Sequence, residues 1–215
     1  MNRSRQRAFT IWDLLICIAA VGMLGIYLPM LARAKRTGCR PACISNLKQV
    51  ALGFRMWSND HTERFPWQVP AAEGGTKEFA HLPYAVLHYV VVSNELNSPK
   101  ILTCPQDANR IRTNVWDAPL HVSLSYFAGL NANETKPTTI LAGDRNVSTN
   151  SSTMVGFLTV QDLNQLQVTP GLHQTYVNVG LADGSVAQLK PDDLRRTAAA
   201  EMKALTNQPV RLVIP

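Results

Sequence analysis

The chain has 215 residues, a formal net charge of +6 and a pI of about 9.4. A basic protein binds nucleic acid when its cations are clustered on the folded part. Here the excess cations flank one N-terminal segment, and from Pro41 onward 14 Lys and Arg are balanced by 14 Asp and Glu. The charge distribution therefore argues against a nucleic-acid partner.

Residues 9–31 form an apolar run that contains one charge, Asp13. As an α-helix the run would be about 35 Å long, enough to cross a hydrocarbon core of about 30 Å. Three interpretations follow. The run is a cleaved secretory signal with a site at Ala32-Arg33-Ala34, a plain signal anchor, or a membrane span in which Asp13 has a functional partner.

The next segment predicts an amphipathic helix over residues 44–58, with an apolar stripe that packs against a sheet. Residues 60–80 are rich in Pro, Gly and charge and predict a loop, and residues 83–93 predict a short helix. The stripe consists of Ile44, Leu47, Val50, Ala51, Phe54 and Trp57.

Four short strands are expected from β-branched and aromatic content, with an exposed polar loop at residues 144–153. These strands are residues 101–105, 123–127, 138–142 and 154–160.

Residues 176–189 predict a β-hairpin, because Asp183-Gly184 between two apolar runs favours a type I′ turn. A last helix is expected from Lys190 to about Leu205, with Asp192 and Asp193 in its first turn.

Four cysteines leave several options open. Cys17 lies in the apolar run and is interpreted as a small apolar filler. Cys39 and Cys43 are one helical turn apart, and Cys104 is distant in sequence. A disulfide, or a zinc site formed by these last three and a His, is compatible with the spacing.

Two sets of residues that include aspartates could form a catalytic or a metal site. His173 and Asp183 are half of a catalytic triad, but turn chemistry explains Asp183 and no Gly-x-Ser-x-Gly elbow accompanies them, so a structural role is favoured. Calcium is a second option, because carboxylate oxygens are its ligands. Its candidate ligands are Asp144, Asp183, Asp192 and Asp193.

Several landmarks taken together resemble one family, the type IV pilins and the type II secretion pseudopilins, and within it the H-x9-DG subgroup. The order and spacing of the landmarks carry this resemblance. They are Ala8 to Leu15, Leu28 to Lys35, Cys43 to Gln49, Phe65-Pro66, Cys104 to Asp107, and His173 followed after nine residues by Asp183-Gly184.

The resemblance implies that a prepilin peptidase cuts between Ala8 and Phe9 and methylates the new N-terminus. Asp13 would then be the fifth mature residue and would pair with the amine of a neighbouring subunit. Ala8 and Asp13 stand where the family usually has Gly and Glu. The resemblance also implies a Cys43–Cys104 disulfide, which leaves Cys39 free or as the alternative partner.

The predicted fold is α+β, with a long N-terminal helix, transmembrane in its first half, packed on a mostly antiparallel sheet. The expected parts are a leader (1–8), a transmembrane and assembly helix (9–31), a stem helix kinked or broken near 38–41 (32–60), and a periplasmic head (61–215). The head is long enough to bury its own core.

The expected function is that of a pseudopilin-like subunit, not an enzyme, that assembles with other subunits into a periplasmic filament for secretion or pilus biogenesis. It would cross the bacterial inner membrane once, with its N-terminus in the cytoplasm. Two alternatives stay open: a membrane-anchored binding module that uses loops near 65–80 and 144–153, and a secreted hydrolase that uses His173 and Asp183.

Overall fold

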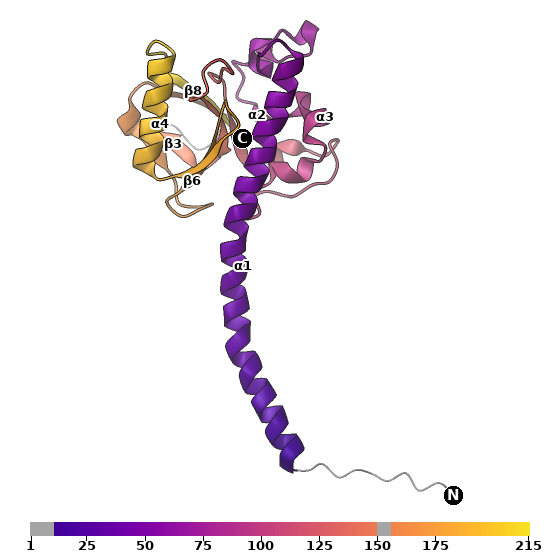
Figure 1. Cartoon of the computed structure of the whole chain (residues 1–215). Coiled ribbons are helices and arrows are strands. Elements are labelled where there is room, and N and C mark those ends of the chain that lie inside the picture. The colour runs from indigo at the N-terminus through magenta and orange to yellow at the C-terminus, as the bar shows by residue number, and fades with distance from the viewer. Residues whose placement is uncertain (1–10, 150–155) are drawn as a thin grey trace, which may run out of the picture. The chain divides into compact units, whose positions relative to one another are not determined.

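The computed structural model describes residues 11–149 and 156–215, with the backbone alone for residues 28–40. Two compact units make up the chain, Met1–Cys39 and Arg40–Pro215. Helix α1 (Ile11–Asp60) belongs to both units, so each part of it is described with its own unit (Figure 1).

Helix α1 is continuous over its 50 residues. The sequence predicted a kink or break near residues 38–41. The helical assignment runs through Gly38 and Pro41, so the helix is not broken there, and the kink stays a prediction. A proline removes one helical hydrogen bond and does not always end a helix. The boundary between the two units falls at this place, after Cys39.

The first part of α1 overturns the predicted membrane span. Within the described ranges, the structure has no helix whose length and apolar character together suit it to crossing a bilayer. This finding contradicts the transmembrane first half, the single-pass topology and the inner-membrane localisation expected from the sequence.

The second part of α1 packs as the stripe predicted. Side chains three and four residues apart fall on one side of a helix, and this side enters the core. Leu52 and Met56, on the opposite side, remain 55% and 50% exposed. Five of the six predicted stripe residues are buried hydrophobic positions, whereas Ile44 is only partly buried and Cys43, one position earlier, is buried in its place. The five are Leu47, Val50, Ala51, Phe54 and Trp57.

The main sheet has six strands in the order β4-β8-β1-β2-β6-β7, and every pair is antiparallel. The structure is thus α+β, with antiparallel pairing throughout the described strands. The strands are β1 (Tyr126–Gly129), β2 (Ile140–Asp144), β4 (Gly156–Val160), β6 (Val177–Leu181), β7 (Val186–Leu189) and β8 (Val210–Ile214). A second, two-stranded sheet pairs β3 (Val147–Thr149) with β5 (Leu166–Val168).

Both faces of the main sheet are covered, and Figure 1 shows the sheet between α4 and the second part of α1. Successive side chains of a strand point to opposite faces. Accordingly, Tyr126 and Ala128 of β1 join the core under α1, whereas Phe127 joins a core with Leu194 and Ala198 of α4 (Pro191–Ala204). Each face of the main sheet therefore packs in its own hydrophobic core.

Short helices connect these elements. Two are α-helical, α2 (Ala85–Val91) and α3 (Ser93–Leu96). The 3-10 helices are η1 (Pro66–Gln68), η2 (Ala71–Glu73), η3 (Lys77–Phe79), η4 (Pro99–Leu102), η5 (Leu120–Val122) and η6 (Leu163–Gln165).

Three local predictions need correction. The expected strand 101–105 is not a strand. Its first two residues end the 3-10 helix η4, because Pro99 fixes a helical φ at the first turn and the side chain of Ser98 accepts the N–H of Lys100. The expected exposed loop 144–153 contains β3, which is buried. Strand β8 was not predicted, although it lies between β4 and β1.

Glu201 of α4 generates a prediction about pH. Its side chain is buried, and Oε2 accepts the backbone N–H of Ile140 at 2.9 Å. Burial raises the pKa of this carboxyl to about 7, only partly offset by that hydrogen bond. The folded chain therefore binds this proton more tightly than the unfolded chain, and stability falls as the pH rises from about 4.5 through 7.

We predict that Glu201→Gln removes a pH-dependent loss of about 3 kcal/mol in the free energy of unfolding between pH 4.5 and pH 8. Urea denaturation at several pH values gives the free energy of unfolding of the variant and of the original chain, and the loss is the difference between their pH dependences. Glu63→Gln, at an exposed position, is the control. Parallel pH curves for Glu201→Gln and the original chain would contradict the assignment.

Candidate functional site

A disulfide joins α1 to the loop after η4. It links Cys43 to Cys104, the pair that the resemblance implied, across a sequence separation of 61 residues. Both cysteines are 0% exposed. Closing a loop of this size restricts the unfolded chain and stabilises the fold by about 4 kcal/mol in the chain-entropy model. Cys17 is an exposed free thiol on α1, and the side chain of Cys39 lies outside the described ones.

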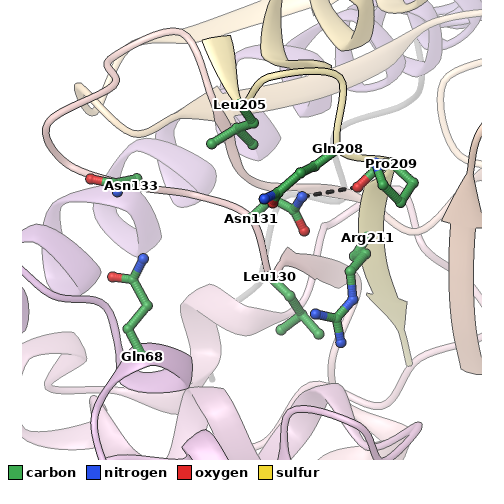
Figure 2. Close-up of a pocket in the computed structure, with 8 residues that line it drawn as sticks. All are labelled: Gln68, Leu130, Asn131, Asn133, Leu205, Gln208, Pro209 and Arg211. Carbon is green, nitrogen blue, oxygen red and sulfur yellow. Dashed lines mark hydrogen bonds between the residues drawn. The ribbon is translucent and has the colours of Figure 1, made fainter. Parts of the chain in front are cut away.

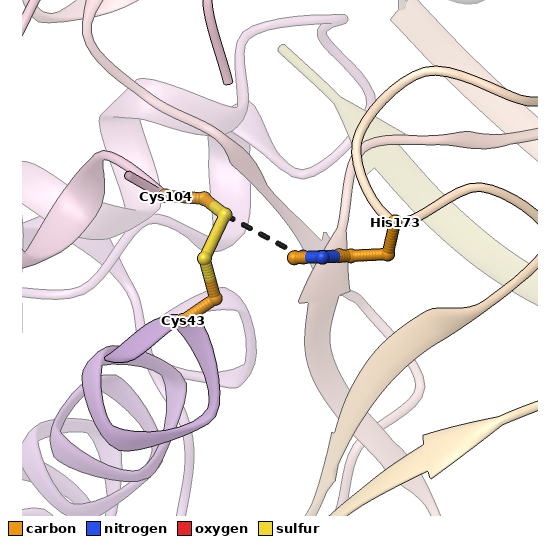
Figure 3. Close-up of side chains that lie close together, drawn as sticks. All are labelled: Cys43, Cys104 and His173. Atoms are coloured by element: carbon orange, nitrogen blue, oxygen red, sulfur yellow. Dashed lines mark hydrogen bonds between the residues drawn. A yellow bond between two sulfur atoms is a disulfide. The ribbon is translucent and has the colours of Figure 1, made fainter. Parts of the chain in front are cut away.

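His173 directs the edge of its ring at this disulfide (Figure 3). Its Nε2 lies 3.5 Å from Sγ of Cys104 and 3.2 Å from Oδ2 of Asp144. The same Oδ2 accepts the backbone N–H of Asn178 at 2.8 Å, because β2 and β6 pair at this point of the sheet. We call Cys43, Cys104, Asp144 and His173 the disulfide–histidine cluster; all four are at most 1% exposed.

Buried polar atoms without partners surround this cluster. Within the described part of the chain, no hydrogen bond reaches Oδ1 of Asp144, Nδ1 of His173, Oδ1 of Asn146 or either side-chain amide atom of Asn178. Such atoms cost about 1–3 kcal/mol each unless water or an ion satisfies them. Their concentration around His173 marks the best candidate for a functional site.

The other end of the H-x9-DG motif lies in the hairpin turn between β6 and β7. Oδ1 of Asp183 accepts a hydrogen bond from the backbone N–H of Ser185 at 2.8 Å. The carbonyl oxygen of Asp183 accepts a second hydrogen bond, from Nη1 of Arg55, also at 2.8 Å. Gly184 has φ +85°, which favours glycine. The predicted hairpin is confirmed, but its turn is not type I′, because a type I′ turn needs positive φ at both Asp183 and Gly184 and only Gly184 has it.

The motif therefore attaches one hairpin to α1 at two places. His173 reaches the disulfide of Cys43, and Asp183 binds Arg55 further along the same helix. The predicted catalytic pair is arranged differently from a triad, since His173 is buried beside Asp144, whereas Asp183 is exposed in the turn. The geometry gives both signature residues a structural contact.

The four calcium candidates have separate surroundings. Asp144 contacts His173 in the interior, and Asp183 lies in the hairpin turn. Asp192 and Asp193 form ion pairs with Arg195 and Arg196 on α4. Among the described residues, the three whose ligand atoms lie within 4.8 Å of one another are instead Cys43, Cys104 and His173, and the two cysteines are joined by the disulfide.

Sequence reasoning missed a second buried network. Asp107 forms two hydrogen bonds with Arg145, at 2.7 and 2.9 Å, and accepts the hydroxyl of Ser125 at 2.9 Å. Burial alone would raise the pKa of Asp107, but the bonds and charge of Arg145, with help from Ser125, lower it. The motif Cys104-Pro-Gln-Asp107 singled out Asp107 in the sequence, but its partner Arg145 is 38 residues away and no spacing pattern links the two.

A pocket of about 300 Å³ lies elsewhere on the second unit (Figure 2). Asn131 donates to the carbonyl oxygen of Pro209 at 2.9 Å at its wall. Its lining offers amides, apolar side chains and one cation, and includes no acid, thiol or histidine. The lining residues are Gln68, Leu130, Asn131, Asn133, Leu205, Gln208, Pro209 and Arg211.

The predicted processing site and assembly charge belong to the first unit. Ala8 and Phe9 lie outside the described residues, so the expected cleavage stays a prediction. Asp13 lies in the first turn of α1.

No protein-family model, no curated protein and no solved structure matches the chain. Function is therefore inferred from the resemblance and from the geometry of the residues themselves.

We predict that Gly184→Ala destabilises the second unit by about 1 kcal/mol or more, because alanine is strained at φ +85° and its Cβ would come within 3.3 Å of Cδ of Arg55. The free energy of unfolding measures this loss. Gly171→Ala is the matched control, since its Cβ would meet nothing within 4 Å. An equal effect of the two variants would show that the turn does not need glycine.

Proposed function

We propose that this chain is a pilin-like structural subunit. It associates with copies of itself through the apolar first part of α1, and the unit Arg40–Pro215 is the folded head of each subunit. The resemblance of the landmark residues supports the proposal, and one observation carries it: the described first part of α1 is apolar and exposed all round.

The exposed side chains are large and lie on every side of the helix. Ile11, Trp12, Val21 and Ile26 are each at least 70% exposed. An apolar helix of this kind is stable when other apolar groups surround it, and a single shallow groove covers only one side. The other large apolar side chains exposed in this segment are Leu14, Leu15, Ile16, Ile18, Met23, Leu24 and Tyr27.

Copies of the same segment meet this requirement. The second unit has its own hydrophobic cores, so it does not need this segment for folding. Identical helices in a symmetric assembly can enclose one another on all sides. At Gly22 and Gly25 an added Cβ would meet nothing within 4 Å, so neighbouring backbones can approach closely there.

Asp13 gives such an assembly a fixed register. A carboxylate enters an apolar interior at low cost only beside a cation. The resemblance supplies this cation as the amine of Phe9 in a neighbouring copy, after removal of residues 1–8.

The alternatives have less support. The binding module was expected to use loops near residues 65–80 and 144–153, but Phe65, Trp67 and Val69 are buried in the core, as is β3. The hydrolase was expected to use His173, which is 1% exposed.

Cys17 provides a natural probe of the association. In a Cys39→Ser background we predict that mild oxidation cross-links Cys17 between copies, and that Asp13→Ala lowers the yield at least tenfold. Removing one partner of a buried ion pair costs about 3–5 kcal/mol, and 1.4 kcal/mol is a factor of ten in affinity. Non-reducing electrophoresis measures the yield.

Asp60→Ala, at the other end of α1, is the control and is expected to cross-link like the original chain. N-terminal sequencing of the cross-linked product is expected to begin at Phe9. A full yield of Cys17 cross-links in Asp13→Ala would exclude the assembly role of this carboxylate.

A further inference from the structure

Two pockets of the second unit adjoin and form one groove. The first, of about 300 Å³, is the pocket in Figure 2, and the second, of about 350 Å³, lies beside it, because Gln68 and Asn133 line both. Thr62, Arg64 and Thr135 are among the other lining residues of the second pocket. Pockets of this size hold small organic ligands. We call the two pockets together the amide groove.

Most polar side chains of the amide groove both donate and accept hydrogen bonds. A side-chain amide has an NH₂ group and a carbonyl oxygen, and a threonine hydroxyl has both capacities at one oxygen. The hydroxyl groups of a sugar have the same double capacity. Leu130 and Leu205 add an apolar surface on which the C–H face of a sugar ring can pack. The polar side chains are Thr62, Gln68, Asn131, Asn133, Thr135 and Gln208.

Internal hydrogen bonds orient two of these amides before any ligand binds. Nε2 of Gln68 donates to the carbonyl oxygen of Ala132 at 3.3 Å, and Nδ2 of Asn131 donates to that of Pro209 at 2.9 Å (Figure 2). Each amide nitrogen carries two hydrogens, so one bond of this kind leaves the second hydrogen for a ligand. Side chains that are already held in place lose less conformational entropy on binding.

Arg211 supplies a cation to the first pocket. Its guanidinium lies over the ring of Phe157, 5.1 Å from the centroid, and Nη2 donates to the carbonyl oxygen of Ala80 at 3.5 Å. The ion pairs of the described residues do not include Arg211, and no acid lines the first pocket. A guanidinium binds a carboxylate through two parallel hydrogen bonds. Arg211 therefore favours a ligand that carries a carboxylate.

The backbone is strained at both pockets. Thr62 and Glu63 have φ of +57° and +58°, and both line the second pocket. Thr206 and Asn207 have φ of +59° and +61°, in the turn that lines the first pocket. Each pair follows the end of a helix, α1 or α4, where glycine or asparagine usually adopts this conformation, whereas β-branched threonine rarely does. Strain of this kind is concentrated at ligand-binding and active sites.

The strand that carries Arg211 argues for a sugar over a peptide. Strand β8 is paired along both edges, with β4 on one side and β1 on the other. A peptide that binds as an added strand needs an unpaired edge for its main-chain hydrogen bonds. Because β8 offers no such edge, the ligand of Arg211 is bound through side chains, and the amides and hydroxyls described above are suited to sugar hydroxyls.

We propose that the amide groove binds a short oligosaccharide that contains one acidic sugar. The carboxylate of this sugar binds Arg211 in the first pocket, and the hydroxyls of the next sugar bind the amides and threonines toward the second pocket. Glu63 and Arg64 both line the second pocket, so that end suits an uncharged sugar. The site lies within the second unit and is separate from the proposed association through the first part of α1.

The experiment uses the full chain and two disaccharides that differ only in the carboxylate. Cellobiouronic acid is a glucuronic acid linked to glucose, and cellobiose is its neutral counterpart. Saturation-transfer NMR titrations give the dissociation constant of each. We expect cellobiouronic acid to bind at least tenfold more tightly, because a hydrogen-bonded charge pair contributes that much in affinity. A capped tripeptide with one glutamate is the third probe and is expected to bind more weakly than cellobiouronic acid.

Variants locate the site. Arg211→Gln is expected to bind the two disaccharides about equally, whereas Arg112→Gln, an exposed cation outside the groove, keeps the tenfold preference. Gln208→Ala changes an exposed lining residue, so it leaves the fold intact by circular dichroism, and it is expected to weaken cellobiouronic acid about fivefold.

Several results would overturn the proposal. They are no saturation transfer to cellobiouronic acid, equal affinity of the original chain for the two disaccharides, and binding of the tripeptide as tightly as the acidic disaccharide. Unchanged affinity in Gln208→Ala, or a tenfold preference that persists in folded Arg211→Gln, would exclude the amide groove as the site.

Discussion

The burial of one side of α1 against the sheet is the contact on which the second unit depends. Phe54 lies between the rings of Trp67 and Tyr89, with centroids 5.5 and 5.2 Å away, and Tyr89 reaches across to donate to the carbonyl oxygen of Phe127. Helix, connecting segment and sheet thus share one aromatic core. The disulfide at Cys43 fixes where along the helix this packing begins.

The H-x9-DG motif strengthens the same contact from the sheet side. One of its ends contacts the disulfide, and the other binds Arg55, so a single hairpin meets the helix twice. The conformational requirement of Gly184 and the burial of His173 are both explained by this attachment. A catalytic role is not needed to account for either residue.

Local signals in the sequence predicted much of this fold. Apolar residues spaced three and four positions apart identified the buried side of α1, and Asp183-Gly184 identified the hairpin. Both features depend on residues that are only a few positions apart in the sequence. Strand β8 and the His173–Asp144 contact depend on pairing between distant segments, which no spacing rule reports. The membrane span failed for another reason: apolar composition alone does not distinguish lipid from protein as the surrounding medium.

The same question of medium applies to the first unit, whose described side chains are exposed and, apart from Asp13 and a few small residues, large and apolar. The two units therefore have different requirements. The second satisfies its hydrophobic residues internally, through two cores on one sheet. For the first unit, we propose that contacts with identical helices of other copies bury its apolar residues.

Hydrogen exchange of the full-length chain, followed by mass spectrometry over a range of protein concentrations, tests this account most directly. Amides of residues 11–27 should exchange more slowly as the concentration rises, while those of β1 and β8 stay unchanged, because association buries only the first part of α1. Exchange in residues 11–27 that is independent of concentration would contradict the account.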